Sequence, residues 1–140
     1  MNLFLDCEFN GFGGELIAMA LIDEHGHYFY EVLPCAAPVE WVANNVIPRL
    51  QQTPISLQLF QQKLNDFLNQ YQQIHIVADW PEDLALFCNS LLIGPGRAIR
   101  TPNLSMQLWS IPAALNIQSS QAHYALADAQ ALAEAYQLVH

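Results

Sequence analysis

The first half of the chain reads as strands followed by helices. Residues 3–9, 16–22 and 28–32 are apolar or β-branched runs separated by turn residues, which predicts a three-stranded meander. Residues 39–47 and 57–71 place apolar side chains at helical spacing. The hydrophobic pattern therefore predicts three strands and then two amphipathic helices.

The second half begins with a further strand that leads directly into a helix. Residues 74–78 are rich in β-branched side chains and predict a strand, and residues 81–92 open with a proline, as many helices do, and then repeat apolar positions. Over residues 98–116 neither the alternation typical of a strand nor the spacing typical of a helix dominates, so the pattern assigns no element to this stretch.

An Ala-rich segment, residues 119–139, predicts the last helix, with Ser119 or Ser120 as its N-cap. The order of elements is then three strands, two helices, a strand, a helix, an unassigned stretch and a final helix. This order favours one α/β domain over residues 1–140, with a mixed sheet flanked by helices.

The composition favours a soluble protein of a reducing compartment. The three cysteines, Cys7, Cys35 and Cys88, are odd in number and far apart, which argues against a disulfide framework or a paired-cysteine zinc site. No Lys or Arg precedes the apolar N-terminus, and acids interrupt it, so neither a signal peptide nor a membrane span fits. We therefore expect a cytoplasmic protein that has no membrane partner.

The charge balance is strongly acidic. Four Lys and Arg residues stand against thirteen Asp and Glu residues, giving a net charge of -9. Such a balance argues against a long basic groove for nucleic acid. A polyanionic ligand would need another source of positive charge.

Two acids, Asp6 and Glu8, interrupt the first predicted strand. They are two residues apart, so their side chains leave the same face of the strand. Two carboxylates about 4 Å apart repel by roughly 4 kcal/mol at an effective dielectric constant near 20, unless they bind protons or a cation. Because carboxylates are hard oxygen ligands, the pair predicts a magnesium or manganese site.

A second acidic cluster, Asp79, Glu82 and Asp83, lies where the strand at 74–78 meets the next helix. Acids in a first helical turn bond to free backbone amides, so capping explains at least two of the three. Such junctions are also where α/β proteins bind ligands. The last predicted helix adds His123 and, five residues later, Asp128, which borders the apolar stripe.

Taken together, these motifs resemble those of the DEDD superfamily of 3′-5′ exonucleases. The spacing of five between His123 and Asp128 resembles its DEDDh branch, and the segment FLDCEF at residues 4–9 is similar to the FLDTEF with which compact bacterial exoribonucleases of that branch open. The likeness follows the order of motifs and of elements over nearly the whole chain. It implies an RNase H-like fold.

The resemblance also implies roles for individual residues. Asp6, Glu8 and Asp128 would hold two divalent ions, Mg²⁺ or Mn²⁺, and His123 would take the proton from the attacking water. Elementary chemistry agrees, because two ions can hold both the attacking and the leaving oxygen of a phosphoryl displacement, and a neutral histidine is a suitable base near neutral pH.

A further Asp completes the implied set of metal ligands. Asp83 is favoured because the family places this residue in the first helical turn before apolar side chains, here Leu84. Asp79 is the other candidate, but it precedes a Trp-Pro pair and is better placed to cap the helix.

The expected function is a metal-dependent 3′-5′ exonuclease that releases nucleoside 5′-monophosphates from the 3′ ends of short single strands of RNA or DNA, with RNA favoured. Phe9, Phe12 and Trp80 are candidates for stacking on the terminal base, although core packing is the simpler role for Phe9. With so few cations we expect about 1 to 3 phosphate contacts. The oligomeric state, including a homodimer, is left open.

Two other functions are compatible with these residues. The scarcity of basic residues would also suit a catalytically weak RNase H-like module that binds nucleic acid or a protein. A hydrolase of small phosphoesters ranks last, because the Asp-x-Asp pair of a common phosphatase class is absent.

Overall fold

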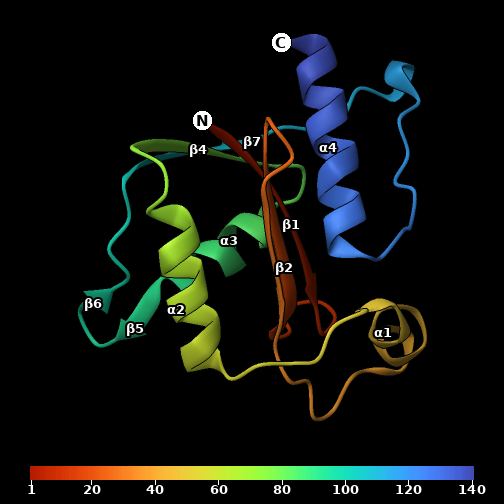
Figure 1. Ribbon diagram of the computed structural model, residues 1–140. Helices are drawn as coiled ribbons and strands as arrows, with labels where there is room; N and C mark the ends of the chain where they lie inside the picture. The colour runs from red at the N-terminus through yellow and green to blue at the C-terminus, as the bar shows by residue number, and fades with distance from the viewer.

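Strand β1 (Asn2–Phe9) forms the centre of a five-stranded mixed sheet. The computed structural model describes all 140 residues (Figure 1). β1 pairs antiparallel with β2 (Leu16–Asp23) and parallel with β4 (Gln73–Ala78). β3 (Tyr28–Val32) extends the antiparallel side, and β7 (Asn103–Leu108) extends the parallel side. The resulting strand order is β3-β2-β1-β4-β7.

Helices cover both faces of this sheet. They are α1 (Glu40–Asn45), α2 (Leu57–Leu68), α3 (Pro81–Ser90) and α4 (Ala125–Val139), with 3₁₀ turns η1 (Ile47–Arg49) and η2 (Ala113–Leu115), and a separate hairpin of β5 (Leu92–Gly94) and β6 (Arg97–Ala98). Figure 1 shows α2 and α3 on one side of β1 and β2, and α1 and α4 on the other. None of these helices combines the length and the apolar character that crossing a bilayer requires.

Alternate side chains of β1 pack into two separate cores, one on each face of the sheet. Leu3, Leu5 and Cys7 pack in the core beneath α2 and α3, and Phe4 packs in the core beneath α4. Half of the α4 side chains in this core are alanines, and small side chains allow a helix to pack close to a sheet. Asp6 and Glu8 follow Phe4 by two and four residues, so their side chains point to the same face of β1, the face that α4 covers.

The structure confirms the α/β class, the mixed sheet and the opening meander. It also confirms helices within the ranges 39–47 and 57–71, although the second ends at Leu68. Ser56 caps that second helix by accepting a hydrogen bond from the backbone N–H of Leu59 at 3.1 Å. Local patterning was therefore sufficient for most elements of the first ninety residues.

The predicted start of the last helix was wrong. The helix begins at Ala125 and not after Ser119 or Ser120. The hydroxyl of Ser119 instead accepts a hydrogen bond from the backbone N–H two residues ahead, at 3.2 Å, which forms a local turn. His123 has a left-handed backbone, φ 66°, that an α-helix cannot contain. His123 therefore precedes the helix instead of lying on it.

The unassigned stretch contains β7, a full strand of the main sheet. Four of its six side chains are exposed because it lies at the sheet edge, so its sequence carries little apolar alternation. The helix predicted over residues 81–92 ends at Ser90, because Leu92 begins the β5–β6 hairpin.

Candidate metal centre

Asp6 lies toward the C-terminal end of β1, opposite Ala20 of β2. Its Oδ2 atom is buried and has no hydrogen-bond partner. Buried polar atoms are almost always satisfied, and a carboxylate is especially costly to leave unpaired. The sheet and α4 therefore enclose an acid whose partner is not provided by the chain.

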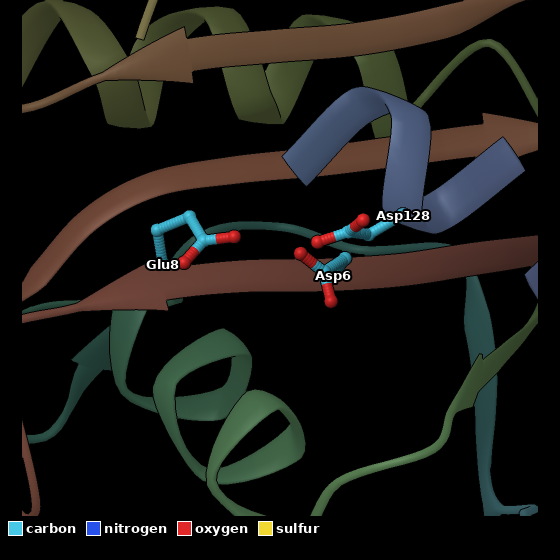
Figure 2. A group of neighbouring side chains, drawn as sticks. All are labelled: Asp6, Glu8 and Asp128. Atoms are coloured by element: carbon cyan, nitrogen blue, oxygen red, sulfur yellow. The ribbon is translucent and has the colours of Figure 1, made fainter. Parts of the chain in front are cut away.

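A first group of acids joins Asp6 with Glu8 and Asp128. One carboxylate oxygen from each of the three acids lies within 4.8 Å of the other two. Figure 2 shows the Asp128 side chain reaching from α4 toward Asp6 and Glu8 on β1. The group forms because Asp6 and Glu8, two residues apart, point to the same face of β1, and the first turn of α4, which carries Asp128, packs over that face.

A second group joins the same Asp6 with Asp79 and Asp83, and here too one carboxylate oxygen from each acid lies within 4.8 Å of the other two. Asp79 directly follows β4 and Asp83 is in the first turn of α3. The sequence favoured Asp83, and the structure brings both acids to Asp6. The capping role expected for Asp79 was wrong, since α3 has Trp80 at its N-cap and no side-chain cap.

All five acids have raised pKa values. Burial, together with the charges of Asp83, Glu8 and other acids, raises the pKa of Asp6 well above its usual range. Burial and the charge of Asp128 raise the pKa of Glu8 to about 7. Burial and nearby acids raise the pKa of Asp83 to about 8. Burial also raises the pKa values of Asp79 and Asp128.

These observations fit two divalent cations that share Asp6. The donor set consists of carboxylates alone, which suits Mg²⁺ or Mn²⁺. The buried Oδ2 of Asp6, which has no hydrogen-bond partner, is an oxygen that such an ion would satisfy. A cation would also offset the repulsion that contributes to the raised pKa values of Asp6, Glu8 and Asp83.

His123 stands at the edge of this acid cluster. Its backbone N–H donates a hydrogen bond to Oδ2 of Asp128 at 3.2 Å, and its ring lies edge-on to the Trp41 ring with centroids 4.9 Å apart. His123 has a left-handed backbone, a conformation that is uncommon for residues other than glycine. Strained backbone of this kind is often found at functional sites, where it holds a side chain in position. The turn therefore sets the imidazole beside the acids.

A pocket of about 510 Å³ opens onto the acid cluster and His123. Aromatic side chains line it as well: Phe12 is 99% exposed, and Trp80 and Trp41 are about half exposed, at 55% and 54%. Phe9 also lines the pocket, but it is half-buried and packs against the core beneath α2 and α3. The exposed rings are available to contact a ligand.

Glu82 holds two parts of the pocket rim together. Its Oε2 accepts a hydrogen bond from the backbone N–H of Gly13 at 3.2 Å, and its Oε1 accepts one from Nε1 of Trp80 at 3.1 Å. Glu82 therefore connects the loop that carries Phe12 to the start of α3.

Sequence reasoning missed two features of this pocket. Trp41 falls outside the apolar positions of its helix, and a large exposed aromatic on a polar face is the signal that would have identified it. The link from Glu82 to the Phe12 loop has no counterpart in local sequence, because sixty-nine residues separate its ends.

No protein-family model matches the chain, and no curated protein matches its sequence. The fold and the site define an α/β protein with a mixed sheet and a pocket of clustered carboxylates.

Proposed function

We propose that the protein is a metal-dependent 3′-5′ exonuclease of RNase H-like fold that acts on short single strands. Asp6 carries the proposal, because it belongs to both acid groups and has a buried oxygen without a partner. An antiparallel meander joined to two parallel strands, with helices on both faces, is compatible with an RNase H-like fold.

The acids divide into two ligand sets around Asp6. Glu8 and Asp128 would hold one ion with Asp6, and Asp79 and Asp83 would hold the other. Two bound ions would stabilise the negative charge that develops on the phosphoryl oxygens. The apolar residues around β1 keep the carboxylates in position before any ion binds.

His123 is the proposed general base. A water attacks the phosphorus of the last phosphodiester, the bond from phosphorus to the 3′-oxygen of the preceding nucleotide breaks, and a nucleoside 5′-monophosphate leaves. His123 takes the proton of the water, and the released 3′-oxygen takes up a proton from solvent. The contacts to Trp41 and Asp128 support this role because they orient the residue at the pocket.

The exposed aromatic rings support a nucleotide as the ligand. Phe12, Trp80 and Trp41 can stack on the terminal base, and stacking contributes about 1 to 3 kcal/mol per base without any positive charge. This mode of binding suits a chain with a net charge of -9. RNA is the proposed substrate.

Incubation of a 5′-labelled oligoribonucleotide with Mn²⁺ tests the proposal. We expect a ladder that shortens from the 3′ end, no ladder in EDTA, and slower cleavage of the deoxyribonucleotide of equal sequence. The variant Asp66→Asn, which alters an exposed acid on α2, should match the wild type. Absence of a ladder would overturn the proposal, and two bound ions without cleavage would favour the binding module instead.

The variant Asp83→Asn should stabilise the metal-free protein in a pH-dependent way. The pKa of Asp83 rises from 3.8 to about 8, so the folded state holds a proton that the unfolded state releases. The stability from this proton is complete below pH 4 and is lost as the pH rises to about 8. The variant's advantage in Tm over the wild type should therefore widen from pH 4 to 8 and then level off.

Added Mn²⁺ should reverse this order at pH 8, because only the wild type keeps the full ligand set and ligand binding stabilises the folded state. Thermal melts in EDTA and in Mn²⁺ measure both effects. A wild type that is the more stable protein in EDTA at pH 8 would contradict the placement of Asp83 in a repulsive cluster.

A further inference from the structure

A groove of about 580 Å³ lies between α2 and the β5–β6 hairpin, and Arg97 and Arg100 line it. These are two of only four Lys and Arg residues in the chain. Side-chain amides of α2, among them Gln58 and Gln62, line the opposite wall, and no acidic residue lines the groove. The groove is therefore a locally positive surface on an acidic protein.

Neither arginine is neutralised by the chain. The protein has one ion pair, between Lys63 and Glu31 at 3.5 Å, and it lies elsewhere on α2 and β3. Unpaired guanidinium groups in a groove without acids attract anions, and their planar set of donors matches phosphate oxygens. The chemistry of the groove selects a phosphate-bearing ligand.

The groove is held in shape by hydrogen bonds at both ends. Nε2 of Gln61 on α2 donates to the carbonyl of Leu92 at 2.8 Å, and Nδ2 of Asn69 donates to the carbonyl of Arg100 at 2.7 Å. Ile99, between the two arginine positions, is buried in the core beneath α2 and α3. A preformed groove loses less conformational entropy when a ligand binds.

A second hollow adjoins this groove and extends toward the loop beside the acid pocket. This hollow shares Leu57 and Gln61 with the groove and reaches Gly13, whose neighbour Phe12 lines the acid pocket. Figure 1 shows the hairpin beside α2, on the side of the sheet away from α4. A strand with its 3′ end in the acid pocket can follow these hollows across the 11–14 loop.

We infer that this groove binds the 5′ portion of the single-stranded substrate, with Arg97 and Arg100 contacting its phosphates. The inference rests on the proposed function for the direction of the strand. A strand is favoured over a free nucleotide because the groove is open, continues toward the acid pocket and presents amides that can bond to successive bases.

Fluorescence anisotropy of a labelled oligoribonucleotide of about ten nucleotides, in EDTA and low salt, tests the inference. The double variant Arg97→Gln/Arg100→Gln should raise its Kd about tenfold or more, since hydrogen bonds to charged groups are lost. The slope of log K against log salt should become shallower by about 1.4, at 0.7 for each of two phosphates. The matched control Arg49→Gln/Lys63→Gln removes the same charge and should leave both quantities nearly unchanged.

Three binding results would overturn the inference: equal weakening by both double variants, a nucleoside monophosphate that binds as tightly as the strand, or no binding by the wild type. A cleavage assay tests the proposed function separately. If the wild type binds the strand through the groove but does not cleave it, only the exonuclease proposal would be rejected. If the double variant Arg97→Gln/Arg100→Gln had the same KM as the wild type on this strand, only the groove inference would be rejected.

Discussion

The variant Asp6→Asn should lose both metal ions and lower kcat/KM on a labelled oligonucleotide by at least about 10³-fold. The reason is geometric, because Asp6 is the one acid that belongs to both carboxylate groups. Asn keeps the size of the side chain but removes the charge that attracts the ions. Calorimetric titration with Mn²⁺ and initial cleavage rates measure the two losses.

Two further variants separate this effect from a general change of charge. Asp128→Asn alters one group only, so we expect it to weaken one ion while the other still binds. Asp66→Asn removes an equal charge from an exposed position on α2 and should behave as the wild type. Two ions binding to Asp6→Asn with unchanged affinity would contradict the shared role of Asp6.

The variant His123→Asn should keep metal binding while losing about 10²- to 10⁴-fold in kcat, the usual effect of removing a general base. Asn is the suitable replacement because it tolerates the left-handed backbone at this position, φ 66°, whereas Ala would add strain. The loss of rate can then be attributed to the imidazole. Titration with Mn²⁺ and single-turnover cleavage rates give the two quantities.

A control histidine is available in the turn between β2 and β3. His25 is exposed, and His25→Asn should leave both metal binding and cleavage unchanged. If His123→Asn weakens Mn²⁺ binding as much as Asp128→Asn does, His123 is a ligand and not a base. Cleavage at the wild-type rate by His123→Asn would exclude both roles.

Local patterning predicted the elements whose side chains are buried on a regular repeat. β2 is buried at all eight positions and α2 buries Phe60, Leu64 and Leu68 at helical spacing, so both could be recognised. The sequence pattern did not predict β7, because an edge strand exposes most of its side chains. The start of α4 escaped because the bonds of Ser119 and the backbone of His123 override the apolar repeat.

The residue types of the site were present in the sequence, and their partners were decided by packing. Asp6 and Glu8 share a face because of strand geometry alone. Asp128 reaches them only because α4 packs over β1, more than a hundred residues away in the chain. Asp79 was taken for a cap, but its carboxylate meets Asp6 because β4 lies parallel beside β1.

The chain's own pattern of apolar and acidic residues determined the class of fold and placed two acids on one face of one strand, where their repulsion must be offset by protons or by a cation. The tertiary structure decided which further acids approach them, the contact between Trp41 and His123, and the position of Arg97 and Arg100 beside α2. Hydrophobic periodicity is a local property, whereas a pocket depends on contacts between segments far apart in the chain. Those contacts exist only once the sheet and its helices have packed.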